Sequence, residues 1–263
     1  MDTEIRLEEI MAEKTGGRKI PAPLLWLLKR FFRIDYFNVF CRERRTGVDF
    51  CNGAIDYLGV RIVVEGLENL PEGGRYTFVS NHPLGGIDGI ALAGIIGDIY
   101  KDIKIPVNDF LLAIPGIAPL CIPINKVGGQ ARNIPAIIDG AFESDSQILL
   151  FPAGLCSRLI DGEVQDIPWT KTFITRSVRT GRDVVPIHFI GENSRKFYMI
   201  ARICKFLKFR VNYAMAFLPE EVCRNKGKTF KVIFGKPIPH TCFDNSRTPS
   251  QWAQWVREKV YEL

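Results

Sequence analysis

One stretch of the chain, residues 76–96, constrains the fold more than any other. It contains a short apolar run, a glycine-rich segment and a second apolar run, which are Tyr76–Val79, Ser80–Gly89 and Ile90–Ile96. This order is typical of a strand, a turn and a helix in a parallel α/β sheet. The glycine-rich segment contains His82 and Asp88. Both therefore follow the carboxyl end of a strand, where α/β sheets commonly place their functional groups.

The spacing of His82 and Asp88 allows the two side chains to meet. A histidine can accept a proton near neutral pH. A carboxylate on its other ring nitrogen fixes the tautomer and stabilises the imidazolium. The glycines let the chain bend so that the aspartate reaches back to the histidine. We therefore predict a proton-accepting pair at this turn; the alternative is that His82 caps a helix and Asp88 is an acidic residue of its first turn.

The length and composition fit one α/β domain. Of the 263 residues 46% are hydrophobic, which is enough for one sizeable core. Apolar runs bounded by turn residues predict strands at residues 61–66, 76–81, 104–107, 120–126, 147–152, 183–191, 211–217 and 229–234. Helices are expected at residues 90–96, 131–142 and 169–179, after residue 194 and from residues 249–250 onward. Residues 159–168 are expected to form a polar loop.

Charge and cysteine usage argue against several classes of function. The net charge is +6, and the basic residues gather in a few segments without a nucleic-acid-binding motif. This favours an anionic membrane surface or an acidic partner over nucleic acid. The seven cysteines form no Cys-x-x-Cys pair and the chain has three histidines, so no metal site is predicted. We expect free thiols in a reducing compartment.

The sequence predicts no segment that crosses a membrane. Residues 1–14 are polar and acidic, unlike a signal peptide. The longest uncharged apolar run, residues 110–124, is interrupted by prolines and is shorter than the roughly 20 residues of a spanning helix. We expect a cytoplasmic protein that lies peripherally at the inner face of the cytoplasmic membrane.

Residues 21–33 are predicted to form an amphipathic helix on the membrane surface. Leucines and phenylalanines gather on one side of this helix, opposite Lys29, Arg30 and Arg33. A second basic amphipathic helix is expected after Ser194. We accordingly divide the chain into an N-terminal helical membrane-associating segment, residues 1–58, and an α/β domain, residues 59–263. The alternative is that both helices pack on the domain and turn their basic faces to solvent.

Four segments between residues 60 and 238 resemble, in order, the signatures of the glycerolipid acyltransferase family. The first is Asn81-His82 with Asp88, with five residues between histidine and aspartate where the common pattern has four. The second is a strand that ends in Lys126, where the family usually has arginine. The third is Phe-Pro-Ala-Gly-Leu-Cys-Ser-Arg at residues 151–158, and the fourth is an apolar strand with Val185-Pro186. The resemblance implies a mixed β-sheet flanked by helices.

The resemblance also implies roles for individual residues. His82 would deprotonate an acceptor hydroxyl, and Asp88 would orient it. The residues implied to bind substrate are Asn81, Lys126, Phe151, Pro152, Gly154, Ser157 and Arg158. Three of the family's polar contacts to glycerol phosphate are replaced, by Ala153, Leu155 and Cys156. Arg158 stands one position later than the family's arginine and could supply the missing cation. Cys156 follows a strand and a glycine, but the second glycine of a nucleophile elbow is absent.

The reaction that the resemblance implies is transfer of a fatty acyl chain from a thioester to a lipid hydroxyl, with no metal or bound cofactor. The thioester would be acyl-carrier protein or acyl-coenzyme A, and the acceptor a lyso-lipid at an anionic membrane surface. The acceptor is 1-acylglycerol-3-phosphate or a lyso-aminolipid, since the pattern also resembles bacterial O-acyltransferases of glycine and ornithine lipids. Two alternatives are an acyl thioesterase in which His82 activates water, and a non-catalytic lipid-binding protein on the membrane surface.

Overall fold

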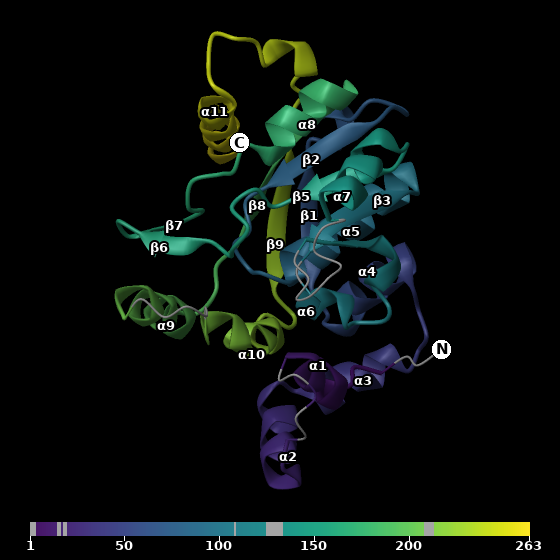
Figure 1. Ribbon diagram of the computed structural model, residues 1–263, viewed down its shortest axis with the longest axis vertical. Coiled ribbons are helices and arrows are strands. Elements are labelled where there is room, and N and C mark those ends of the chain that lie inside the picture. Colours follow the sequence, from purple (N-terminus) through teal and green to yellow (C-terminus); the bar gives the residue numbers. More distant parts are fainter. Residues whose placement is uncertain (1–3, 15–16, 18–19, 108, 125–133, 208–212) are drawn as a thin grey trace.

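The centre of the molecule is a seven-stranded mixed β-sheet (Figure 1). The computed structural model describes residues 4–14, 17, 20–107, 109–124, 134–207 and 213–263. In spatial order the strands are β1 (Arg61–Glu65), β9 (Thr229–Phe234), β8 (Asp183–Ile190), β2 (Tyr76–Ser80), β5 (Gln147–Leu150), β3 (Ile103–Val107) and β4 (Cys121–Pro123). β8 and β9 are antiparallel, and all other neighbours pair in parallel. The predicted mixed sheet is confirmed.

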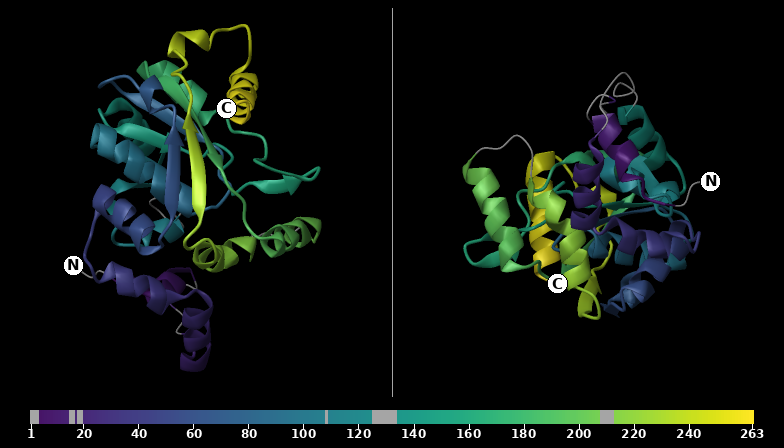
Figure 2. Two further views of the ribbon diagram at one scale, coloured as in Figure 1. Left: turned by 180° about the vertical axis from the view of Figure 1, so that it is seen from behind. Right: turned by 90° about the horizontal axis from the view of Figure 1, so that it is seen from below.

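Helices cover both faces of this sheet (Figures 1 and 2). The α-helices are α1 (Leu7–Lys14), α2 (Ala22–Phe31), α3 (Ile34–Cys41), α4 (Gly47–Tyr57), α5 (Ile87–Tyr100), α6 (Asp109–Leu112), α7 (Ile134–Glu143), α8 (Thr172–Thr180), α9 (Arg195–Phe206), α10 (Leu218–Arg224) and α11 (Pro249–Tyr261). Short 3-10 helices are η1 (Leu67–Asn69), η2 (Ala118–Leu120), η4 (Tyr213–Phe217) and η5 (His240–Cys242). One core cluster joins the sheet to α4 and α5, and another joins it to α8 and α11.

The central strand β2 is buried on both faces, which explains its continuous apolar sequence. Phe78 belongs to the core cluster of α4 and α5, and Val79 to that of α8 and α11. Parallel strands share one carboxyl end, so the segment after β2 emerges at the middle of this edge. β8 runs beside β2 in parallel and leads toward α9 at the lower end of the molecule in Figure 1.

The buried Arg182 anchors the opposite edge of the sheet, where β8 begins. Its side chain is 0% exposed. The guanidinium donates hydrogen bonds to the carbonyl oxygens of Phe142 at 2.7 Å, Ser146 at 2.9 Å and Tyr76 at 3.3 Å, and to that of Ser144. Burial lowers the pKa of Arg182 to about 10. Backbone carbonyls thus hold a buried cation where α7, β5 and β2 meet.

Two local predictions are wrong. Residues 159–168 do not form an open loop, because β6 (Arg158–Ile160) and β7 (Glu163–Gln165) pair as an antiparallel hairpin. Asp161 and Gly162 make its turn with φ of 52° and 89°, as a two-residue hairpin turn requires. The strand expected at residues 211–217 is also absent from the described part, where residues 213–217 form η4. α10 begins directly after η4, and Pro219 lies in its first turn, where a proline favours the start of a helix.

The N-terminal helix α2 is present within residues 21–33, and its role as an amphipathic helix on the membrane surface stays a prediction. Leu25 and Leu28 pack against the core. On the exposed side lie further apolar side chains, which are Leu24, Trp26, Leu27 and Phe31, at 47, 64, 55 and 40% exposure. Lys29 forms an ion pair with Glu8 of α1 at 2.6 Å. Buried residues of α3 and α4 share the core of the sheet, and the division at residues 58 and 59 stays a prediction.

Helices α4 and α5 approach closely because α5 contains glycines at the contact. A methyl group on Gly97 would lie 2.3 Å from Cγ2 of Val48. We therefore expect Gly97→Ala to destabilise the fold by about 1–3 kcal/mol through overpacking, although alanine favours helices over glycine. Chemical unfolding measures this change.

Gly140 of α7 is the matched control, since no atom of the described residues lies within 4 Å of a methyl group placed there. Gly140→Ala should stabilise the protein by about 0.5–1 kcal/mol. Equal effects of the two substitutions would contradict the close packing of α4 on α5.

Candidate active site

The predicted pair of His82 and Asp88 lies at the carboxyl end of β2, in the middle of the sheet. His82 follows β2 and Asp88 is in the first turn of α5, so the glycine-rich segment joins the two elements. The structure brings Nδ1 of His82 within 3.0 Å of Oδ2 of Asp88. The imidazole keeps 18% of its surface exposed, while the Asp88 side chain is fully buried. The unusual spacing of five residues therefore still permits a direct contact.

Asp88 also organises the backbone of the turn. Its Oδ2 accepts hydrogen bonds from the N–H groups of Leu84 at 2.8 Å and Gly85 at 3.1 Å. Its Oδ1 accepts from Gly86 and Gly89, each at 2.9 Å. These four backbone N–H donors favour the ionised form of the Asp88 carboxylate over the protonated form. With Asp88 ionised, Nδ1 of His82 carries the proton of their hydrogen bond and Nε2 remains the proton acceptor.

The charges of the pair shift both pKa values. Burial lowers the pKa of His82, but the charge and hydrogen bond of Asp88 outweigh it, so this pKa lies above its usual value. Burial raises the pKa of Asp88, but His82 and the backbone N–H groups outweigh it, so this pKa lies below its usual value. The site therefore combines a fixed negative charge with a histidine of increased basicity, which suits general-base chemistry.

Phe151 and Gly85 shape the surroundings of the histidine. The ring of Phe151 lies 4.1 Å from the imidazole, centroid to centroid. Gly85 has a φ of 74°, and a methyl group there would come within 2.2 Å of Sγ of Cys156. Cys156 itself is buried, and burial raises the pKa of its thiol to about 12. A neutral, enclosed thiol fills space beneath the turn and is unsuited to act as a nucleophile.

Two residues predicted to bind substrate are buried and have partners within the protein. The amide of Asn81 donates to the carbonyl of Phe189 at 2.9 Å and accepts from its N–H at 2.7 Å, which extends the pairing of β2 with β8. Ser157 is 0% exposed, and its Oγ donates to Oδ1 of Asp166 at 2.6 Å. Both side chains thus support the site from within the fold. Their contact with substrate stays a prediction, against which their burial argues.

Three further predicted substrate-binding residues follow β5, with Pro152 and Gly154 on the turn and Arg158 at the start of β6. Pro152 is buried, whereas Gly154 is exposed and has a φ of 68°. Arg158 is half-buried, donates to the carbonyls of Cys156 and Ser157, and lies over the ring of Phe197. Its positive charge acts on His82, because it opposes protonation of the imidazole. Within the described part of the chain no carboxylate forms an ion pair with Arg158. Lys126 lies outside the described residues.

Sequence reasoning missed Asp166, which contacts the site from β7's carboxyl end. Its Oδ1 accepts a hydrogen bond from the backbone N–H of His82 at 3.2 Å, across 84 positions of the chain. No local pattern indicates such a contact. The Asp161-Gly162 turn was the available signal, because a hairpin there returns the chain from Arg158 toward the site.

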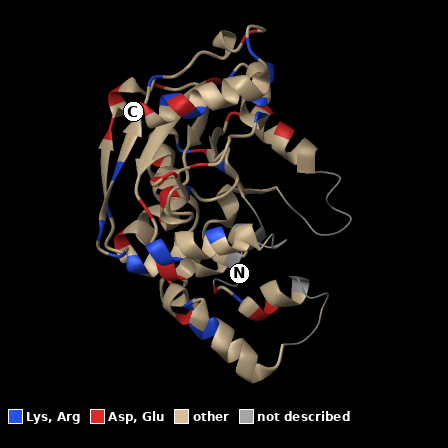
Figure 3. Ribbon diagram, turned by 90° about the vertical axis from the view of Figure 1, so that its left-hand side faces the viewer, with Lys and Arg blue, Asp and Glu red and all other residues tan. Residues whose placement is uncertain are grey.

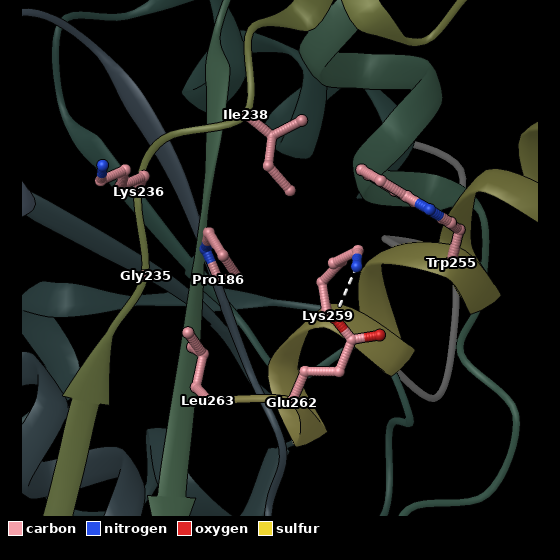
Figure 4. Close-up of a pocket in the computed structure, with 8 residues that line it drawn as sticks. All are labelled: Pro186, Gly235, Lys236, Ile238, Trp255, Lys259, Glu262 and Leu263. Atoms are coloured by element: carbon pink, nitrogen blue, oxygen red, sulfur yellow. Dashed lines mark hydrogen bonds and ion pairs between the residues drawn. The ribbon is translucent and has the colours of Figure 1, made fainter.

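Three further findings concern the described residues. The described residues contain no group of three or more His, Cys, Asp or Glu side chains arranged to hold a metal. A hollow of about 260 Å³ lies between the end of β9 and α11, lined by residues such as Lys236, Trp255 and Lys259 (Figure 4). None of the predicted site residues lines it.

In the described part of the chain, no helix has the length and apolar character to span a bilayer.

The sequence is similar to known proteins along nearly its whole length. The sequence matches the acyltransferase family over residues 9–263. It is 48% identical to the lyso-glycine lipid O-acyltransferase of Phocaeicola vulgatus, over 98% of this chain and 95% of that protein. It is 49% identical to the lyso-glycine lipid O-acyltransferase of Bacteroides thetaiotaomicron, over 93% of this chain and 91% of that protein.

The fold is also similar to a solved structure. The crystal structure of the 1-acyl-sn-glycerophosphate acyltransferase PlsC from Thermotoga maritima aligns with a TM-score of 0.53 and 17% identity, over 98% of this chain and 83% of that one. At this identity the likeness concerns the fold. The match along nearly the whole sequence leads to one conclusion: the chain belongs to the acyltransferase family and is an acyltransferase.

Proposed function

We propose that the protein transfers a fatty acyl chain from a thioester to the hydroxyl of a lyso-lipid, with His82 as general base. The observation that carries this proposal is the contact of Nδ1 of His82 with the buried carboxylate of Asp88. The names of the relatives at 48% and 49% identity support a lyso-lipid acceptor. The donor is acyl-carrier protein or acyl-coenzyme A, and no bound cofactor takes part.

The proposed step needs one proton acceptor that later returns the proton. The acceptor hydroxyl attacks the thioester carbonyl while Nε2 of His82 takes the hydroxyl proton. Asp88 stabilises the imidazolium that forms. When the tetrahedral intermediate collapses, the C–S bond breaks and His82 protonates the leaving thiolate. The products are an ester and a free thiol.

We further propose a lyso-aminolipid with a carboxylate headgroup as acceptor, of which lyso-glycine lipid is the prime candidate. Arg158 lacks a carboxylate partner among the described residues, and its charge acts on His82, so it lies where an anionic headgroup could pair with it. Cys156 is buried and cannot take over the headgroup contact that the family's arginine makes. 1-Acylglycerol-3-phosphate is the competing acceptor, and the two are compared in the same assay.

The enzyme is proposed to meet this acceptor on an anionic membrane surface. α2 and α9 lie toward the same end of the molecule, to which β8 leads (Figures 1 and 2). Phe31 at the end of α2 contacts Phe217 of η4, with ring centroids 5.4 Å apart. α9 adds exposed apolar side chains, which are Met199, Ile203 and Phe206, at 56, 48 and 83% exposure. Figure 3 shows Lys and Arg, interspersed with Asp and Glu, on the helices of this end, between uncharged stretches. Such surfaces suit a lipid interface.

The first expectation concerns the His82/Asp88 pair. His82→Ala should lower kcat by about 10²–10⁴-fold, because the general base is lost. Asp88→Asn should also lower kcat and move the acid limb of the rate profile to lower pH. The sign follows because the reaction needs neutral His82, whose pKa the Asp88 charge raises above its usual 6.5. Steady-state rates of acylated lipid formation between pH 5 and 9 measure both effects.

A second histidine–aspartate contact serves as the control. Nδ1 of His240 lies 2.8 Å from Asp183 at the opposite edge of the sheet. His240→Ala should keep the rate within about twofold of wild type. If His82→Ala retains more than about a tenth of the wild-type rate, the general-base role is refuted.

If the wild-type protein releases only free fatty acid, it is a thioesterase, and if it binds lipid without turnover, the catalytic proposal is wrong.

The second expectation concerns Arg158. Arg158→Lys keeps the charge but loses the planar fork that pairs with a carboxylate. The acceptor KM should rise more than kcat falls, because headgroup binding contributes about equally to ground and transition states. Kinetics with varied acceptor and saturating thioester measure this. Arg61→Lys, exposed at the start of β1, is the control. A normal acceptor KM in Arg158→Lys would remove Arg158 from the site, and Lys126→Ala tests the second predicted cation in the same way.

The third expectation concerns the membrane. Wild-type protein should sediment with anionic vesicles and dissociate as salt rises, because each well-placed cation contributes about 1 kcal/mol. Leu27→Glu in α2 and Phe206→Glu in α9 should each weaken binding at low salt. Val178→Glu is the matched control, since Val178 is 42% exposed on α8. Equal binding of all three variants would show that these helices do not contact lipid.

A further inference from the structure

Three hydrogen bonds link the backbone of His82 to Ser157 and Asp166 in a closed cycle. The N–H of Ser157 donates to the carbonyl of His82 at 2.8 Å. The N–H of His82 donates to Oδ1 of Asp166 at 3.2 Å, and Oγ of Ser157 donates to the same oxygen at 2.6 Å. None of these bonds involves the imidazole. These three hydrogen bonds therefore fix the main chain that carries the imidazole, whereas Asp88 fixes Nδ1 of the imidazole itself.

Asp166 is buried together with its partners. Asp166 and Ser157 are 0% exposed and Trp169 is 3% exposed. Nε1 of Trp169 donates to Oδ2 of Asp166 at 2.8 Å, so three donors converge on the two carboxylate oxygens. These donors favour the charged form, although burial raises the pKa of Asp166. Among the described residues no lysine or arginine forms an ion pair with this carboxylate.

The C-terminal helix α11 holds Asp166 in place. The backbone N–H of Asp166 donates to the hydroxyl of Tyr261 at 2.7 Å. Arg257 donates to the carbonyl of Asp166 at 2.6 Å and to Oε1 of Gln165 at 2.8 Å. The helix itself starts with a capping box formed by Thr248 and Gln251. α11 therefore holds the backbone of Asp166, while His82, Ser157 and Trp169 hold its carboxylate.

We propose that Asp166, through its hydrogen bonds to His82 and Ser157, is a positioning residue that keeps Nε2 of His82 aimed at the acceptor hydroxyl. This inference rests on the proposed acyl transfer. Asp166 does not touch substrate, because it is enclosed beneath the histidine. Its contribution is geometric, and a displacement of a catalytic group by about 1 Å can cost about 10²-fold in rate.

Asp166 also contributes charge to the site, which supplies a separate readout. Among the described residues, three charged groups act on His82 from different parts of the fold: Asp88 and Asp166 raise its pKa, and Arg158 lowers it. Removal of the Asp166 charge should therefore lower the pKa of His82. Loss of the Ser157 hydroxyl leaves the charge in place and should not lower that pKa.

The test compares Asp166→Asn and Ser157→Ala with Ser146→Ala in the full-length protein. Ser146 is the matched control, since its buried Oγ donates to Asp102 at the same 2.6 Å, at the amino end of β5. We expect kcat to fall about tenfold or more in Asp166→Asn and about threefold or more in Ser157→Ala, with the acceptor KM nearly unchanged. Ser146→Ala should keep kcat within about twofold. NMR titration of the imidazole, assigned by comparison with His82→Ala, should show a lowered His82 pKa in Asp166→Asn alone.

Several results would overturn the inference. These are a folded Asp166→Asn with kcat within about twofold of wild type, an equal loss in Ser146→Ala, or an unchanged His82 pKa in Asp166→Asn. If Asp166→Asn does not fold, Ser157→Ala decides, and a normal kcat there refutes the positioning role. Failure of the proposed function is distinct, because wild-type protein would then form no acylated lipid. The NMR titration is independent of any assay of activity.

Discussion

The carboxylate of Asp88 is the interaction on which the site depends. It accepts hydrogen bonds from four backbone N–H groups of the glycine-rich turn and contacts the imidazole of His82. One buried charge thus fixes both the path of the chain and the tautomer of the histidine. A glycine is required at residue 85, where φ is 74° and the thiol of Cys156 leaves no room for a methyl group. With five residues between His82 and Asp88, the turn still closes on this one acceptor.

The strand, turn and helix at residues 76–96 could be predicted because their signals are local. Apolar runs and glycines specify β2, the turn and α5. The resemblance to the acyltransferase family supplied the expectation of a mixed sheet flanked by helices. The contact of His82 with Asp88 followed from six positions of separation. Family membership then followed from similarity along nearly the whole chain.

The remaining features depend on contacts that sequence patterns do not encode. Asp166 reaches His82 only because the β6–β7 hairpin and α11 place it there. The apolar run after residue 211 suggested a strand, yet residues 213–217 are helical and lead into α10. Leucines of α2 lie on both its packed and its exposed side, since their distribution depends on how the helix sits on α3 and the core. Asn81 has the position expected of a substrate contact, but its amide joins two strands.

The anchorage by Arg182 makes the two edges of the sheet respond differently to acid. As pH falls, Asp166 takes up a proton before Asp88, because burial raises the pKa of Asp166, whereas His82 and the backbone N–H groups hold the pKa of Asp88 below its usual value. The carbonyl groups around Arg182 do not titrate, and the guanidinium stays charged at every pH below about 10. Protons can therefore loosen the edge that carries the chemistry while the opposite edge holds. Protonation of the general base His82 and loosening of this edge would both be local events within a sheet that is still intact.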